Sequence, residues 1–207
     1  MGAVPPVMPA AGGCSAPLLL VCFAIPEEVV ELNVPGFRVR TLLTGVGKVN
    51  AAFRLTDAIL REHPAFVLNV GTAGTLRLAV GDIVVSNHFI DRDYEQLRLH
   101  GLDYGATTDG GVLFPKLSAA MPTHLRGKDH AVNTGDNFVT ETAQLTGDVV
   151  DMEAYAEAVV CNTYGLPFVA VKCVTDVIGQ NSVALWNERL SEARRALSGF
   201  FSGVNFA

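Results

Sequence analysis

Residues 165–176 read Gly-Leu-Pro-Phe-Val-Ala-Val-Lys-Cys-Val-Thr-Asp, and this stretch is the strongest indication of the fold class. Its run of Val, Phe and Ala predicts a strand that is buried on both faces, as the central strands of α/β sheets are. The run ends in Lys172, Thr175 and Asp176, polar groups that have no place in a dry core. Ligands of open α/β sheets bind outside the carboxyl ends of such strands, so these side chains are candidates for a site.

A second acidic cluster lies upstream, where residues 150–154 read Val-Asp-Met-Glu-Ala at the start of an apolar-periodic helix. Glu153 could be only a helix-dipole partner, or it could be a partly buried carboxylate that accepts hydrogen bonds from hydroxyl groups. Asp176 could be a helix cap or turn residue, or a general acid whose burial favours the protonated form near neutral pH. Two carboxyl groups at one sheet edge would suit cleavage of a bond to the anomeric carbon of a sugar.

Two segments in the first half of the chain point to the same edge. A strand over residues 18–24 leads into Glu28, which is either a dipole partner or a carboxylate able to activate a water. A strand over residues 66–70 is followed by Gly-Thr-Ala-Gly at residues 71–74. This is either a compact turn or a place where backbone approaches a ligand and Thr72 donates a hydrogen bond.

The remaining patterns predict a single α/β domain with a central mixed sheet flanked by helices. Further strands are expected over residues 39–44, 83–90 and 130–134. Helices are expected over residues 49–63, 152–163 and 186–201. Residues 91–128 have a weaker pattern, which is typical of a lid or a subunit contact.

Length and composition exclude several classes of protein. The 207 residues, 49% hydrophobic and 17% charged, fit one well-buried domain over residues 17–207, after a poorly ordered tail at residues 1–16. A net charge of −6 without basic runs argues against a nucleic-acid partner. No apolar run reaches the roughly 18 residues of a membrane span. No Lys or Arg precedes Arg38, as a secretory signal would need, so we expect a cytoplasmic protein.

Together these segments resemble the 5′-methylthioadenosine/S-adenosylhomocysteine nucleosidases, within the nucleoside phosphorylase-I superfamily. The matching pieces are AIPEEV (24–29), TGVGKVNAA (44–52), NVGTAGTL (69–76), VGDIVVS (80–86), TGDNFV (134–139), VDMEA (150–154) and LPFVAVKCVTDV (166–177). The resemblance implies a central mixed sheet flanked by helices, a homodimer, and hydrolysis of the N-glycosidic bond of a purine nucleoside. It implies no metal or redox cofactor.

The resemblance also implies roles for individual residues. Glu28 would activate the attacking water, Asp176 would protonate purine N7, and Glu153 would accept the ribose hydroxyls. With the strand-end Thr175, the substrate-binding set is Thr72, Phe138, Val139, Met152, Glu153, Lys172 and Thr175. In this set Phe138 and Met152 would contact base and sugar, and Val139 would offer main-chain contacts to the purine. Thr72 replaces the family's more usual Ser, and Lys172 stands where many members have Arg.

Three alternatives stay open at this point. Phosphorylases of the superfamily usually carry an Arg where this chain has Asn69, and a basic loop where it has Glu27 and Glu28, so water is expected rather than phosphate. The divergent residues 91–128 leave open methylthioadenosine, both thioadenosines, or futalosine-type nucleosides. A non-catalytic nucleoside-binding protein would not need all three carboxyl groups.

Overall fold

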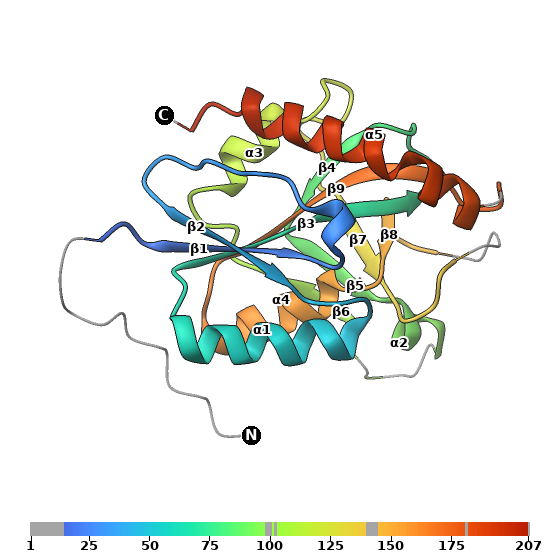
Figure 1. Ribbon diagram of the computed structural model, residues 1–207. Coiled ribbons are helices and arrows are strands. Elements are labelled where there is room, and N and C mark those ends of the chain that lie inside the picture. The colour runs from blue at the N-terminus through green and yellow to red at the C-terminus, as the bar shows by residue number, and fades with distance from the viewer. Residues whose placement is uncertain (1–14, 98–100, 102, 140–144, 181, 207) are drawn as a thin grey trace.

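The computed structural model describes residues 15–97, 101, 103–139, 145–180 and 182–206, which form a mixed sheet with helices on both faces (Figure 1). The strands are β1 (Leu18–Phe23), β2 (Arg38–Leu43), β3 (Phe66–Thr75), β4 (Ile83–Ser86), β5 (His88–Asp91), β6 (Gly105–Thr107), β7 (Ala131–Thr134), β8 (Val149–Asp151) and β9 (Phe168–Val177). The helices are η1 (Pro26–Glu28), α1 (Lys48–Glu62), α2 (Arg92–Leu97), α3 (Phe114–Ala120), α4 (Ala154–Tyr164) and α5 (Ser182–Gly203). The predicted fold class is confirmed.

Strand β3 is the centre of the sheet. It runs parallel to β1 on one side and to β9 on the other, and its last residues pair antiparallel with β8. From β1 the sheet continues to β2, and from β8 to β7, β5 and β6, while β4 pairs with β9. Because β1, β3 and β9 are parallel, their carboxyl ends meet at the same edge of the sheet.

The helices cover the two faces of the sheet. Figure 1 shows α1 and α4 side by side on one face and α5 across the other. Helix α1 buries Ala51, Leu55, Ala58 and Ile59 against the sheet and ends at His63, whose φ of 50° is left-handed. The following Pro64 could not continue the helix.

Several predicted boundaries were wrong. Residues 71–74 are not a turn, because β3 continues to Thr75 through its pairing with β9. The strand expected over residues 83–90 is two strands, β4 and β5, separated at Asn87. The segment of weak pattern, 91–128, contains α2, β6 and α3. Short elements of this kind carry too little periodicity to be recognised from sequence.

Of the tail predicted over residues 1–16, residues 1–14 lie outside the described residues, and the extent of the predicted domain, 17–207, stays a prediction. Within the described part, the structure contains no helix with the length and hydropathy that a membrane crossing demands.

Candidate active site

A cavity of about 150 Å³ lies at the shared carboxyl edge of β1, β3 and β9. Its wall includes seven of the nine residues that the sequence predicts for a site: Glu28, Thr72, Phe138, Val139, Met152, Glu153 and Asp176. Lys172 and Thr175 are not in the wall; both are buried, and each contacts a carboxylate. Elements from both halves of the chain therefore converge on one space.

Glu28 occupies the first corner of the cavity, on η1 directly after β1. Its side chain is buried, and its Oε1 accepts hydrogen bonds from the backbone N–H of Thr72 at 2.8 Å and from the Thr72 hydroxyl at 2.6 Å. Gly71 makes room for it, because a Cβ there would lie 3.2 Å from Oε1. Gly71 and Thr72, both within β3, thus accommodate and bind the Glu28 carboxylate.

Asp176 also lines the cavity and lies near the end of β9. The Thr175 hydroxyl donates to Asp176 Oδ1 at 2.9 Å, and the Asp176 side chain is buried. Opposite it, the pairing of β3 with β9 shifts register between Ala73 and Gly74, as at a β-bulge. A Cβ on Gly74 would lie 3.0 Å from Asp176 Oδ2. The bulge and the glycine together let this carboxyl group reach the cavity.

Glu153, the third of these acids, lies at the N-cap position of α4, but its side chain does not cap its own helix. Its Oε1 accepts a 2.8 Å hydrogen bond from the backbone N–H of Gly47, which is the N-cap residue of α1. Burial, followed by the charge of Asp151, raises the pKa of Glu153 to about 8, against the opposing influence of Lys172. The Glu153 side chain therefore accepts a hydrogen bond at the start of a different helix from the one expected, while it still lines the cavity.

Asp151, a fourth carboxyl group that lines the cavity, forms a buried ion pair with Lys172. Lys172 Nζ lies 2.8 Å from Asp151 Oδ2, and both side chains are almost fully enclosed. Burial acts to lower the pKa of Lys172, but the carboxylates of Asp151 and Glu153 outweigh it and raise that pKa. Asp151 also accepts hydrogen bonds from the Thr134 hydroxyl and from the backbone N–H of Ala154, so it caps α4. Lys172 thus acts on the site as a positive charge that Asp151 fixes in place.

Glu157 is a buried acid that the sequence reasoning missed. It lies one turn after Glu153 on α4, fully buried, and its carboxylate oxygens have no hydrogen-bond partner of normal geometry among the described residues. Burial raises the pKa of Glu157 to about 7, although Lys172 and the neighbouring Asn69 act to lower it. The sequence feature that could have indicated Glu157 is its spacing of four residues from Glu153, because residues so spaced lie on the same face of a helix.

Replacing Glu157 with Gln is expected to stabilise the protein at pH 8, relative to wild type, by up to about 3 kcal/mol. The pKa is 4.5 in an unfolded chain and about 7 here. Because the folded-state pKa of Glu157 is raised, its contribution to the free energy of unfolding is fully present below pH 4.5 and is lost as the pH rises through 7. Urea unfolding at pH 5 and pH 8 measures this, with exposed Glu188→Gln on α5 as the control. An equal Glu157→Gln effect at both pH values would contradict it.

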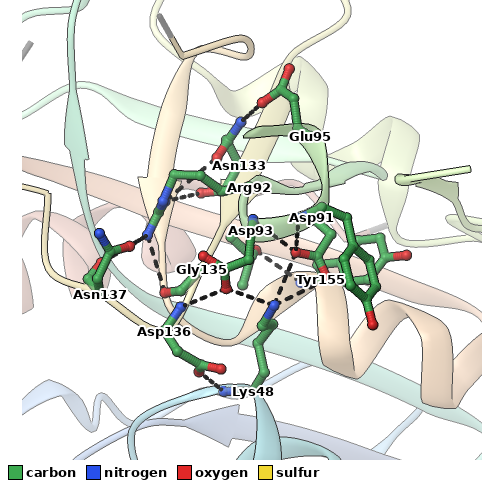
Figure 2. Close-up of polar contacts among 12 residues, drawn as sticks. Lys48, Asp91, Arg92, Asp93, Glu95, Asn133, Gly135, Asp136, Asn137 and Tyr155 are labelled. Atoms are coloured by element: carbon green, nitrogen blue, oxygen red, sulfur yellow. Dashed lines mark hydrogen bonds and ion pairs between the residues drawn. The ribbon is translucent and has the colours of Figure 1, made fainter. Parts of the chain in front are cut away.

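Arg92, the first residue of α2, also lines the cavity and was not predicted. It is 1% exposed, and its guanidinium donates to the backbone carbonyls of Asn133 at 3.0 Å, Gly135 at 3.1 Å and Asn137 at 2.8 Å (Figure 2). Gly135 lies directly against it, because a Cβ there would be 2.8 Å from the Arg92 Nε. Arg92 therefore holds the backbone that leads to Phe138 in the cavity wall.

Lys48, the first residue of α1, connects that helix to β5, to α2 and to the segment that follows β7. Its Nζ lies 2.9 Å from Asp91 Oδ1 and 2.8 Å from Asp93 Oδ2, as Figure 2 shows. Its backbone N–H donates to Asp136 Oδ1 at 2.7 Å, and the Asp136 N–H donates in turn to Asp93. The start of α1, which holds Glu153 through Gly47, is thus fixed by two acidic segments.

The chemistry of the cavity is that of carboxyl groups. Among the described residues, no cluster of three or more His, Cys, Asp or Glu has an arrangement that could hold a metal ion. The wall combines the carboxyl groups of Glu28, Glu153 and Asp176 with the aromatic rings of Phe138 and Trp186, and it also includes Asp151 and Arg92, which are engaged with Lys172 and with backbone carbonyls. Such a site can offer proton transfer and hydrogen bonds to hydroxyl groups beside apolar surface for a flat ring.

Comparison with known proteins shows which family the chain is similar to. The model of the family described as the phosphorylase superfamily matches residues 27–204. A protein of Bacillus pumilus (strain SAFR-032) named 5′-methylthioadenosine/S-adenosylhomocysteine nucleosidase is 32% identical over 170 residues, 73% of this chain and 74% of the relative.

Solved structures show the same fold. The 5′-methylthioadenosine/S-adenosylhomocysteine nucleosidase of Helicobacter pylori, in a crystal structure with butyl-thio-DADMe-Immucillin-A, superposes with a TM-score of 0.76 at 17% identity, over 90% of this chain and 96% of that chain. Futalosine hydrolase of Helicobacter pylori strain 26695 gives a TM-score of 0.76 at 16% identity, with the same coverage. With the family match and the relative at 32% identity, the chain belongs to the phosphorylase superfamily and, within it, to the 5′-methylthioadenosine/S-adenosylhomocysteine nucleosidase family.

Proposed function

We propose that the protein hydrolyses the N-glycosidic bond of 5′-methylthioadenosine, S-adenosylhomocysteine or both, releasing adenine and the 5′-thioribose. The observation that carries this proposal is the convergence of Glu28, Glu153 and Asp176 on one largely apolar cavity. Glu28 comes from η1, Glu153 from the N-cap position of α4, and Asp176 from β9. Each accepts a hydrogen bond from another residue. A simple nucleoside-binding protein would not need three buried carboxyl groups in contact with the ligand.

In the proposed mechanism the three carboxyl groups divide the work. Asp176 protonates N7 of the purine and makes adenine a better leaving group. The bond between C1′ and N9 then stretches towards a sugar with oxocarbenium character. Glu153 accepts hydrogen bonds from the ribose hydroxyls, and its ionised form, which predominates above its pKa of about 8, adds negative potential beside that cation. Water held by Glu28 attacks C1′ and loses a proton to the carboxylate.

The other predicted residues support this arrangement. We assign Phe138 and Val139 to contacts with the purine. The ring of Phe138 lies edge to face with that of Trp186, with 6.2 Å between the ring centroids. Met152 is assigned to the sugar. Lys172 and Thr175 act from behind the wall, Lys172 through Asp151 and Thr175 through the carboxyl group of Asp176.

Water rather than phosphate is the proposed nucleophile. The loop after β1 carries Glu27 and Glu28, and Glu28 lines the cavity. Asn69, which stands where phosphorylases have Arg, is 2% exposed inside β3 and is not part of the cavity wall. A negatively charged corner repels phosphate. Futalosine hydrolysis is the second candidate, because a futalosine hydrolase superposes as well as a nucleosidase does.

Adenine release from methylthioadenosine, adenosylhomocysteine and inosine, with and without phosphate, tests the proposal. Release of adenine from either thioadenosine in phosphate-free buffer is the expected result, and the ratio of the two rates measures discrimination in the 5′ pocket. Turnover only with phosphate would identify a phosphorylase and contradict our interpretation of Asn69. Hydrolysis of futalosine alone would favour the second candidate.

A second copy of this chain is the proposed partner. Val49, Phe53 and Leu60 form a stripe on α1 and are 78%, 73% and 53% exposed. An apolar stripe of this kind is expected to be covered in an assembly. Phe53→Asp should therefore shift the protein from dimer to monomer in sedimentation velocity, whereas Arg194→Asp on α5 should not. A wild-type protein that is monomeric at micromolar concentration would contradict the proposal.

We also propose that the protein works in the cytoplasm. Cys22, Cys161 and Cys173 are all free and buried. Free thiols are typical of reducing compartments. Localisation of a tagged full-length chain by fractionation would test this, and recovery outside the cytoplasmic fraction would contradict it.

A further inference from the structure

Trp186 reaches the catalytic corner of the cavity from α5. It is the only tryptophan of the chain, and it lines the same cavity as Glu28 and Thr72. Its indole Nε1 lies 2.9 Å from Thr72 Oγ1, and Thr72 Oγ1 lies 2.6 Å from Glu28 Oε1. Side chains from α5, β3 and η1 thus form a line of two hydrogen bonds that ends on the carboxylate.

The chemistry at the two ends fixes the direction of these hydrogen bonds. An indole N–H can only donate, and an ionised carboxylate can only accept. The Thr72 hydroxyl must therefore accept from Trp186 and direct its own proton to Glu28. The backbone N–H of Thr72 donates to the same Oε1 at 2.8 Å. Because both donors hold Oε1, we expect the attacking water on Oε2.

We propose that Trp186 is a positioning residue for the reaction, and this inference rests on the proposed function. Its indole N–H orients the Thr72 hydroxyl so that the hydroxyl holds Glu28 in the geometry needed to bind and activate water. A hydroxyl without that donor is free to rotate towards other acceptors. The carboxylate would then spend less time in its productive orientation, and this would slow the chemical step.

A different role would give a different result. The rings of Trp186 and Phe138 meet edge to face at an interplanar angle of 68°, so Trp186 could serve only as an aromatic wall for the substrate. Trp186→Phe separates the two roles, because it keeps an aromatic ring beside Phe138 and removes the N–H. Loss of a wall contact raises KM, whereas loss of positioning lowers kcat.

The kinetic test is a double-mutant cycle between Trp186→Phe and Thr72→Val. In the wild-type background, Trp186→Phe is expected to lower kcat about 5- to 10-fold, the range of one hydrogen bond, with KM changed less than about 2-fold. In the Thr72→Val background it should lower kcat no further, because no hydroxyl remains to orient. In the Thr72→Ser background the loss should return. Equal losses in all three backgrounds, or a change confined to KM, would overturn the proposal.

The fluorescence of the single tryptophan tests the contact without any reference to activity. Thr72→Val removes the acceptor of the indole N–H and should shift the emission maximum, while Thr72→Ser should leave it unchanged. Emission that is the same in all three proteins would overturn the contact itself. If the emission shifts but no nucleoside is hydrolysed by the wild type, the proposed function fails and the contact stands, so the two failures can be told apart.

Discussion

Replacing Asp176 with Asn is expected to lower kcat by about 100-fold or more while the protein stays folded. The Asp176 side chain is 2% exposed and is packed closely against Gly74, so only an isosteric replacement fits without rearrangement. Asn keeps the acceptor for the Thr175 hydroxyl, but it has no acid proton to give to purine N7. Steady-state and single-turnover adenine release would measure the loss.

The control for this variant is Asp57→Asn on the exposed side of α1, where the carboxylate pairs with Arg61 at the surface. It makes the same exchange of Asp for Asn outside the cavity and should leave kcat within about 2-fold, because surface ion pairs contribute little. If Asp176→Asn turned over at a near-normal rate, Asp176 could not be the general acid, and another donor in the wall would have to supply the proton.

Replacing Glu28 with Gln is expected to lower hydrolysis by roughly 10²- to 10⁴-fold and to leave nucleoside binding nearly unchanged. Gln keeps the shape of the side chain and can still accept from the N–H and hydroxyl of Thr72 through its amide oxygen. It cannot take a proton from water. Equilibrium dialysis with a thioadenosine would measure binding, and adenine release would measure turnover.

The adjacent Glu27 provides a matched control, because it is exposed and does not line the cavity. Glu27→Gln should therefore turn over like the wild type. Unchanged activity in Glu28→Gln would remove Glu28 from the mechanism, and a loss of binding in that variant would assign it to substrate affinity instead.

Most of the central sheet could be predicted because its strands are continuous apolar runs. The apolar runs indicated β1, β3 and β9. These strands are parallel, so their carboxyl ends lie at one edge of the sheet. Glu28, after β1, and Asp176, near the end of β9, therefore come to the same edge. The true end of β3 could not be predicted. Thr72 and Thr75 are extended because a strand from the far end of the chain pairs with them, and no local pattern reports that.

The residues missed in the site have a common physical reason. Glu157 lies on the buried face of α4, although its residue type alone predicts an exposed side chain. The charge of Lys172, on β9, partly offsets the cost of burying its carboxylate. Arg92 is enclosed by backbone carbonyls of β7 and of the segment that follows it, more than forty residues away. Both depend on partners that only the folded chain supplies.

The central position of β3 also bears on how the chain is synthesised. One edge of β3 is covered early by β1, but β9, which covers the other, begins only at Phe168. Until the ribosome has released that last part, a ten-residue strand that is almost entirely buried in the folded protein presents an unpaired edge. Nascent chains stopped before β9 are therefore exposed to edge-to-edge aggregation, and yield in a cell depends on how quickly the C-terminal segment follows.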